Sequence, residues 1–194
     1  RQLAGIGVRP IEVTGEAVSR LAASQRAALQ SIVSSSMAVL TGGPGTGKTT
    51  VIGAILSLAD QAALKTALAA PTGRAAMRMK EATGREAKTL HRLLEFNPQN
   101  GRFMRDEHNP LDADWVVIDE ASMLDIGLAD HLLRAISPGT RLTFVGDADQ
   151  LPPVGPGDPF RSLIASEVVP VAWLTEVFRQ EEGSEIVAAA HQVL

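Results

Sequence analysis

A glycine-rich segment that ends in a lysine and two threonines has the residue types and spacing best suited to chemistry. Residues 42–50 read GGPGTGKTT, which matches the phosphate-loop pattern G-x-x-x-x-G-K-[S/T]. Glycines let backbone N–H groups surround phosphate oxygens, and the N-terminus of a following helix adds the positive end of its dipole. In this pattern Lys48 reaches the β and γ phosphates, and the Thr49 hydroxyl holds Mg²⁺. The residues expected to bind the nucleotide are Gly43, Pro44, Gly45, Thr46, Gly47, Lys48, Thr49 and Thr50.

An acidic pair after an apolar run supplies the second chemical feature. Asp119 and Glu120 follow the residues WVVI at 115–118. An aspartate at the end of such a strand holds Mg²⁺, usually through one of the waters bound to the ion. A glutamate beside it can orient a water and deprotonate it for attack on the γ phosphate. Together with the phosphate loop, this pair indicates hydrolysis of the nucleotide as well as binding.

Two further polar residues are candidates for contacting the γ phosphate. Gln150 lies in the loop after an apolar run at 141–145. Its amide can donate to a phosphate oxygen and accept from the attacking water, which is what a sensor of the nucleotide state requires. Arg179 is a candidate for stabilising the charge on the transferring phosphoryl group. Taken alone, Arg179 is more typical of a surface arginine, and its spacing carries little weight.

Apolar runs alternate with helical patterns along the chain. The expected strands are residues 37–40, 64–70, 115–118 and 141–145, and the expected helices are residues 25–33, capped by Ser24, 51–60 and 125–136. This alternation predicts an α/β fold with a mainly parallel sheet and helices on both faces. Ligands of such sheets lie beyond the carboxyl ends of the strands, where all the polar motifs fall.

The charge of the 194-residue chain is unevenly distributed. The net charge is −4, but residues 65–105 hold nine of the eighteen Lys and Arg residues and only three acidic ones. This basic segment suits a polyanion held in one groove, and a solvated helix face is the alternative. The sequence lacks an apolar run of eighteen residues, a signal-peptide pattern and any cysteine. We therefore expect a soluble, cytoplasmic protein that does not contact a membrane.

Six segments, taken in order, resemble the successive motifs of superfamily-one DNA helicases of the RecD type. They are residues 42–50, 70–76, 89–93, 117–123, 145–154 and 174–180. The resemblance implies that residues 24–180 form a RecA-like P-loop NTPase lobe. Such a lobe uses ATP and Mg²⁺, and it couples hydrolysis to movement along single-stranded DNA from 5′ to 3′. It also implies a role in DNA recombination or repair.

The same resemblance assigns roles to individual residues. Gln25 stands where the family contacts the adenine base, although an ordinary exposed helix glutamine is the alternative. His91 is assigned to DNA, with a packed core histidine as an equal alternative. The residues that the resemblance places along the DNA are Pro71, Thr72, Gly73, Arg74, Thr89 and His91. Among the aromatic residues, Phe144, Trp115 and Trp173 are assigned to packing, and Phe96 and Phe103 are the candidates for stacking on bases.

The resemblance also divides the chain. Residues 1–23 are interpreted as a lead-in from an upstream region, and residues 181–194 as the start of a connection to a second RecA-like lobe that this chain lacks. The turn-rich segment 97–110 is expected to form a small hairpin that helps to split the duplex. One lobe cannot perform the opening and closing that translocation requires, so the isolated chain is expected to bind ATP, hydrolyse it weakly and not unwind DNA.

Several alternatives remain open from the sequence. One is a regulatory nucleotide-binding module in a larger assembly, and another is an ATPase of the clamp-loader or remodelling type. RNA is an alternative substrate, because 2′-OH contacts are invisible in a sequence. Within the resemblance, a stand-alone helicase, a subunit of a recombination nuclease and the helicase part of a conjugative relaxase are all compatible with these motifs.

Overall fold

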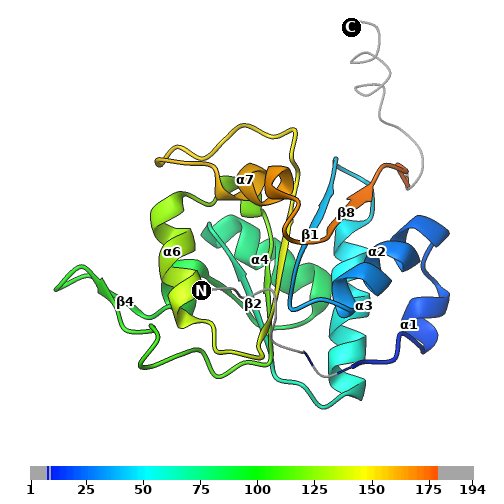
Figure 1. Cartoon of the computed structure of the whole chain (residues 1–194), viewed down its shortest axis with the longest axis horizontal. Coiled ribbons are helices and arrows are strands. Elements are labelled where there is room, and N and C mark those ends of the chain that lie inside the picture. The colour runs from blue at the N-terminus through cyan, green and yellow to red at the C-terminus, as the bar shows by residue number, and fades with distance from the viewer. Residues whose placement is uncertain (1–7, 9, 179–194) are drawn as a thin grey trace, which may run out of the picture.

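A six-stranded parallel sheet forms the centre of the computed structural model, which describes residue 8 and residues 10–178 (Figure 1). The strand order is β3-β2-β6-β7-β1-β8. The strands are β1 (Met37–Gly42), β2 (Thr66–Ala70), β3 (Ala87–Thr89), β6 (Trp115–Ile118), β7 (Arg141–Gly146) and β8 (Val171–Leu174). This architecture confirms the predicted α/β class.

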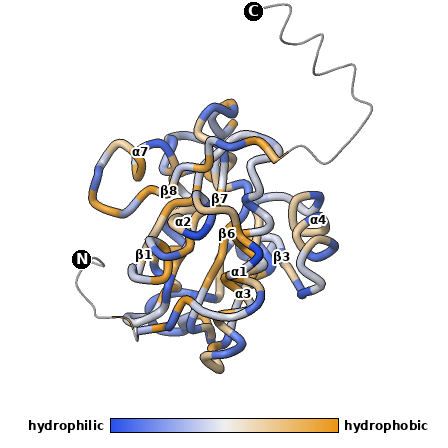
Figure 2. The backbone as a smooth tube through the Cα atoms, turned by 90° about the vertical axis from the view of Figure 1, so that its right-hand side faces the viewer, coloured by the Kyte–Doolittle hydropathy of each residue, from blue (hydrophilic) through white to orange (hydrophobic). Residues whose placement is uncertain are grey.

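Helices cover both faces of the sheet. The α-helices are α1 (Glu16–Ser19), α2 (Ala23–Val33), α3 (Lys48–Gln61), α4 (Gly73–Thr83), α5 (Leu90–Leu93), α6 (Ile126–Ala135) and α7 (Pro159–Ser166), and a 3-10 turn, η1, spans Ala121–Met123. The core beside α1, α2 and α3 lies on one face, and the core beside α5, α6 and α7 lies on the other. Figure 2 shows the hydrophobic residues concentrated in the central strands.

The central strands are apolar without interruption because both of their faces are buried. In β6, Trp115 and Val117 pack into the core beside α3, whereas Val116 and Ile118 pack into the core beside α6. All four side chains are fully buried. Burial of a side chain of this size stabilises the fold by about 1.5–3 kcal/mol. The strand that leads to Asp119 is therefore held firmly.

Polar side chains determine where several helices begin at the carboxyl edge of the sheet. Thr72, Thr89 and Asp125 each accept a hydrogen bond from the backbone N–H three residues later, at distances of 3.2, 3.2 and 2.8 Å. Such caps satisfy N–H groups that have no partner within the helix. These caps fix the helix starts next to the strand ends that carry the motifs.

Two expectations about individual residues are wrong. Ser24 does not cap α2, because the helix begins at Ala23 with Ala22 as its N-cap, so that Ser24 lies inside the first turn and its Oγ donates to Glu176. The Gln25 side-chain oxygen accepts a hydrogen bond from Ala22 N at 3.1 Å. Trp173 was assigned to packing, but it is 52% exposed. It lies on β8, an edge strand within the described residues, and points away from the core. Trp115 and Phe144 are buried as expected.

The structure describes part of the segment before residue 24 and none of the segment after residue 180. Within residues 1–23, Val18 of α1 and Leu21 are buried in the core beside α3, so part of this segment packs with the lobe. Residues 181–194 lie outside the described residues, as does Arg179. In the described part of the chain, no helix has the length and apolar character needed to cross a membrane.

A two-stranded hairpin projects from the lobe beside α6 (Figure 1). It consists of β4 (Phe96–Asn97) and β5 (Arg102–Phe103), which pair in antiparallel register. The turn contains Gly101 in the left-handed region at φ +67°, as the Asn-Gly sequence suggests. The hairpin lies within the turn-rich segment 97–110, except for its first residue.

Candidate functional site

The phosphate loop joins the end of β1 to the start of α3 and adopts an anion-binding shape. Gly45 and Gly47 are in the left-handed region, at φ +76° and +84°. A Cβ atom at Gly42 would lie 2.5 Å from the Leu174 carbonyl oxygen, so this position also requires glycine. Lys48 Nζ donates to the carbonyl oxygens of Gly42 and Gly43, at 2.6 and 3.0 Å. The ammonium group is therefore held directly over the loop, where phosphate oxygens would replace those carbonyls.

The acidic pair after β6 combines burial with backbone strain. Burial raises the pKa of the Asp119 carboxyl, and the neighbouring charge of Lys48 opposes this rise. Glu120 has φ +51°, a left-handed conformation that is uncommon for a residue with a side chain. Such strain costs about 1–3 kcal/mol and is concentrated at functional sites. The bend directs Glu120 away from the path of the strand, while its N–H donates to Asp119 Oδ1 at 2.9 Å.

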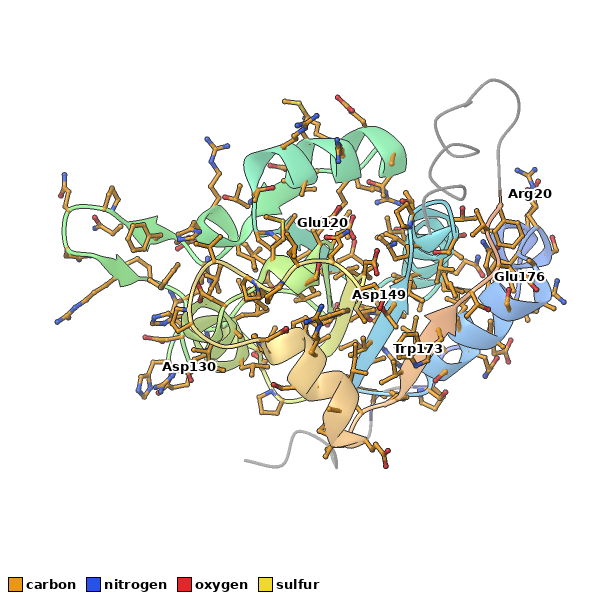
Figure 3. All side chains as sticks on the ribbon, turned by 90° about the horizontal axis from the view of Figure 1, so that it is seen from above. Arg20, Glu120, Asp130, Asp149, Trp173 and Glu176 are labelled. Atoms are coloured by element: carbon orange, nitrogen blue, oxygen red, sulfur yellow. The ribbon has the colours of Figure 1, made fainter. Side chains whose placement is uncertain are left out.

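The loop that carries Gln150 is attached to its surroundings on three sides. Ser122 Oγ of η1 donates to Gln150 Oε1 at 3.3 Å. Ala148 N donates to Thr41 Oγ1 of β1 at 3.1 Å. Arg161 of α7 donates from Nε to the Ala148 carbonyl at 2.9 Å and from its terminal nitrogen to the Gln150 carbonyl at 2.7 Å. The Gln150 loop is thus held by η1, which directly follows the acidic pair, and by β1 and α7. Figure 3 shows Glu120 and Asp149, the residue before Gln150, in the same central region of the molecule.

Gln25 lies against the phosphate loop. It is only 5% exposed, so the alternative of an ordinary exposed helix glutamine is wrong. A Cβ atom at Gly47 would lie 2.1 Å from Gln25 Nε2. Phe178 also contacts the loop: its N–H donates to the Gly45 carbonyl at 2.9 Å, and its ring lies 3.6 Å from the same Cβ position of Gly47. The start of α2 and the segment after β8 therefore flank the loop, and contact between Gln25 and a base stays a prediction.

The residues expected to bind Mg²⁺ suit an ion that is shared with the nucleotide. Thr49 is exposed at the start of α3, and Asp119 is partly buried opposite Lys48. The described residues contain no cluster of three or more His, Asp or Glu side chains that would hold a metal by themselves. Mg²⁺ prefers one or two protein oxygens, with waters and phosphates as the remaining ligands. A hydroxyl and a carboxylate beside a phosphate loop fit this requirement.

The residues expected to contact DNA lie together on the side of the sheet formed by β2 and β3. These strands are paired, with Ala70 opposite Thr89, so the segments that follow them are neighbours. The Thr72 and Thr89 hydroxyls accept hydrogen bonds as helix caps, and each keeps its own proton for donation. Arg74 and His91 are exposed, so the alternative of a packed core histidine is wrong for His91. Its ring nevertheless contacts Phe96 and Phe103 of the hairpin, with ring centroids 5.5 and 5.6 Å away.

Comparisons with known proteins agree with this arrangement. A family model described as an AAA domain matches residues 25–156. The ATP-dependent RecD2 DNA helicase of Deinococcus radiodurans is 42% identical over 190 residues, which are 98% of this chain and 26% of the relative. The RecBCD enzyme subunit RecD of Mycolicibacterium smegmatis is 44% identical over 164 residues, 72% of this chain and 30% of that subunit.

The chain belongs to the RecD-type helicase family. It spans about a quarter to a third of the length of these relatives. The Pif1 helicase structure from Candida albicans superposes with a TM-score of 0.65 and 27% identity, covering 89% of this chain and 43% of that one. A Bacteroides Pif1 structure shares the fold, with a TM-score of 0.56 and 22% identity. The predicted family and the RecA-like fold are confirmed.

Two residues of this RecD-type lobe were missed by the sequence analysis. Ser122 lies inside a recognised motif, but nothing in its spacing indicates a partner 28 residues away. Arg161 lies in no motif, and its contacts with the Gln150 loop depend on where α7 packs. Its only sequence signal is the Asp158-Pro159 pair, which predicts a helix start nearby. Both residues position Gln150 and do not themselves reach the nucleotide site through any recorded contact.

Proposed function

We propose that the longer protein containing this lobe is an ATP-dependent DNA helicase that translocates on single-stranded DNA from 5′ to 3′. The observation that carries this proposal is the constrained trio of Asp119, Glu120 and Gln150 at the carboxyl edge of the sheet. The strained backbone of Glu120 and the three-sided attachment of the Gln150 loop are costly arrangements that suit catalysis.

In the proposed reaction each residue acts on the triphosphate or on the attacking water. Backbone N–H groups of residues 43–50 cradle the phosphates, and Lys48 neutralises charge on the β and γ groups. Thr49 and Asp119 would hold Mg²⁺, which supplies additional charge stabilisation when it is bound. Glu120 accepts a proton from the water, and Gln150 orients that water. Arg179 would complete the charge stabilisation, and Gln25 would contact the adenine.

The proposed DNA path crosses the ends of β2 and β3, beside the nucleotide site. The contacts assigned to it are Pro71, Thr72, Gly73, Arg74, Thr89 and His91. Arg74 and the other cations of the basic segment would neutralise phosphates and release counterions, so binding would weaken steeply with salt. The hairpin β4–β5 stands beside this path and is proposed to separate the duplex strands.

In this proposal, regions of the protein outside this chain complete the motor. A second RecA-like lobe would close on this one when ATP binds and open after hydrolysis. Among the relatives, one is named an ATP-dependent DNA helicase and another a subunit of the RecBCD enzyme. We accordingly propose a cytoplasmic role in DNA recombination or repair, either alone or with recombination-complex subunits.

Steady-state ATP hydrolysis with and without single-stranded DNA tests this function. It would be measured on the full-length protein and on this chain, with Glu120→Gln as the inactive control. Strong stimulation by DNA of the full-length protein, with little stimulation of this chain, is the expected result. An absence of stimulation in both would overturn the helicase proposal and favour a regulatory nucleotide-binding module.

A further inference from the structure

A cluster of four rings joins the hairpin to the body of the lobe. The cluster consists of His91, Phe96, Phe103 and His131. Phe103 is its centre, with ring centroids 4.4 Å from His131, 5.0 Å from Phe96 and 5.6 Å from His91. Phe103 packs inward against the core beside α6, whereas Phe96 is 38% exposed. Of the two phenylalanines proposed for base stacking, Phe103 is therefore committed to internal contacts.

His131 is the member of the cluster that belongs to another part of the fold. Phe96 and Phe103 lie in the hairpin and His91 lies in α5 just before it, whereas His131 lies on α6. The contact between Phe103 and His131 consequently bridges two elements that are far apart in the sequence. Figure 1 shows the hairpin projecting beside α6, and Figure 3 shows the same relation from above, with Asp130 of α6 labelled.

The other contacts near the hairpin act at its base and not on its strands. Leu111 N donates to the Ala135 carbonyl at the end of α6, at 2.9 Å, which holds the segment after the hairpin. Met104 N donates to the Leu94 carbonyl, and Arg105 pairs with Glu95 at 2.7 Å, but these contacts join the two ends of the hairpin stem to each other. The ion pair between Glu107 and Arg134 of α6 is long, at 3.9 Å, and exposed. Exposed pairs of this kind contribute little.

Packing does not hold the hairpin stem from its other side. A cavity of about 290 Å³ lies beside the stem, between β2, β3 and the segment before β6. Arg105 of the stem and Thr66 of β2 both line it. Because this side of the stem is open, swinging of the hairpin is opposed by the contacts of Phe103, which are with His91 of α5, with the core beside α6 and, at the shortest ring distance, with His131 of α6.

The helix α6 is itself fixed to the nucleotide site. It follows Glu120 and the turn η1, and Asp125 caps its first turn. Ile126 N donates to the Pro156 carbonyl at 3.0 Å, which ties the helix start to the loop that continues from Gln150. A group attached to α6 therefore keeps its position relative to the nucleotide site.

We infer that His131 is a positioning residue, which holds the hairpin at a fixed direction relative to α6 through its ring contact with Phe103. This inference rests on the proposed function, in which the hairpin separates strands. Because strand separation depends on where the hairpin meets the duplex, loss of this contact reduces unwinding but not movement on single-stranded DNA. An aromatic pair of this kind favours the hairpin position in contact with α6 over other hairpin positions by roughly two- to tenfold.

The test uses the full-length protein and a forked duplex with a 5′ single-stranded tail. The rate of unwinding and the ATP hydrolysis stimulated by single-stranded DNA are measured in parallel. His131→Ala is expected to lower unwinding by roughly two- to tenfold and to leave the stimulated hydrolysis unchanged. His131→Phe, which keeps a ring, is expected to restore unwinding. His108→Ala is the matched control, because His108 is exposed in the segment after the hairpin and has no recorded ring contact.

A variant with residues 96–103 replaced by a short Gly-Ser linker separates this inference from the proposed function. If that variant still unwinds DNA at the normal rate, the hairpin does not separate strands, and both the hairpin role and the inference are overturned. If that variant fails to unwind while His131→Ala unwinds normally, only the inference is overturned. Equal losses of unwinding and of stimulated hydrolysis in His131→Ala, or no rescue by His131→Phe, would also overturn it.

Discussion

Replacing Arg161 tests whether catalysis depends on the loop that carries Gln150. The guanidinium donates to the Ala148 and Gln150 carbonyls at 2.9 and 2.7 Å, and it lies 3.7 Å from Asp158. A hydrogen bond from a charged donor contributes about 1.5–3 kcal/mol. Since the Arg161 side chain is 47% exposed, water replaces part of this contribution. We therefore expect Arg161→Ala to cost the ordered loop about 1–2 kcal/mol in total, a factor of roughly 5–30.

The assay is ATP hydrolysis by the full-length protein in the presence of single-stranded DNA. Because Gln150 orients the attacking water in the proposed reaction, kcat is expected to fall by roughly 5–30-fold, with a smaller change in KM for ATP. Hydrogen exchange of the Ala148 and Gln150 amides should accelerate by a similar factor. Arg161→Lys should be intermediate, because one ammonium group cannot match the two-pronged contact of a guanidinium.

Arg20→Ala provides the matched control. Arg20 is also an exposed arginine paired within a helix, with Glu16 of α1, and it has no recorded contact with the loop. It should change neither kcat nor the exchange of the loop amides. If Arg161→Ala keeps both the wild-type kcat and the wild-type exchange rates, the loop does not need this attachment, and the assigned positioning role is wrong.

Substitutions at three positions, Glu120, Asp119 and Gly47, test the nucleotide site. Glu120→Gln should keep ATP binding and lower kcat by about 10²–10⁴-fold, whereas Glu120→Gly should be equally inactive but raise Tm, because glycine relieves the strain at φ +51°. Burial raises the pKa of the Asp119 carboxyl, so the folded state binds that proton more tightly than the unfolded state, and stability is lost as pH rises above the ordinary aspartate pKa of about 4. Asp119→Asn should therefore be more stable than the wild type in urea at pH 7, and this difference should vanish at lower pH. The variant should also lose the stabilisation that Mg²⁺ and ATP give the wild type. A variant less stable than the wild type at pH 7 would contradict this reasoning. Gly47→Ala should weaken ATP binding in a titration, because the Cβ would lie 2.1 Å from Gln25 Nε2 at φ +84°, and the control Gly53→Ala, with nothing within 4 Å of the new Cβ, should leave binding unchanged.

Local patterns in the sequence are sufficient for much of the nucleotide site. The phosphate loop and the acidic pair are each contiguous, and their glycines, lysine and carboxylates act within a few residues of one another. The apolar run 115–118 predicts a strand buried on both faces, and Trp115 and Ile118 are buried in opposite cores. In a parallel sheet, all strands end at the same edge, so the motifs that follow those strands must meet.

The same reasoning fails where the partner is distant or where exposure depends on the strand order. Ser24 has the right residue type for a cap, yet α2 already begins at Ala23, and the Ser24 hydroxyl donates to the distant Glu176. Trp173 is apolar and lies in a strand, but Ala172 and Leu174 of β8 point into the core beside α2, and Trp173 points to the opposite, exposed face. Residue type and spacing do not encode which faces of an edge strand the helices cover.

The sequence by itself determined the chemistry of this protein: a phosphate loop, an acidic pair and a glutamine, placed after apolar strands. It also determined the α/β class, because strand and helix periods are local properties. Only the tertiary structure decided that Arg161 holds the Gln150 loop, that Gln25 lies against Gly47, and that His131 meets Phe103 of the hairpin. These contacts join residues separated by many positions, and they form only after the core has set the order of the strands and the packing of the helices.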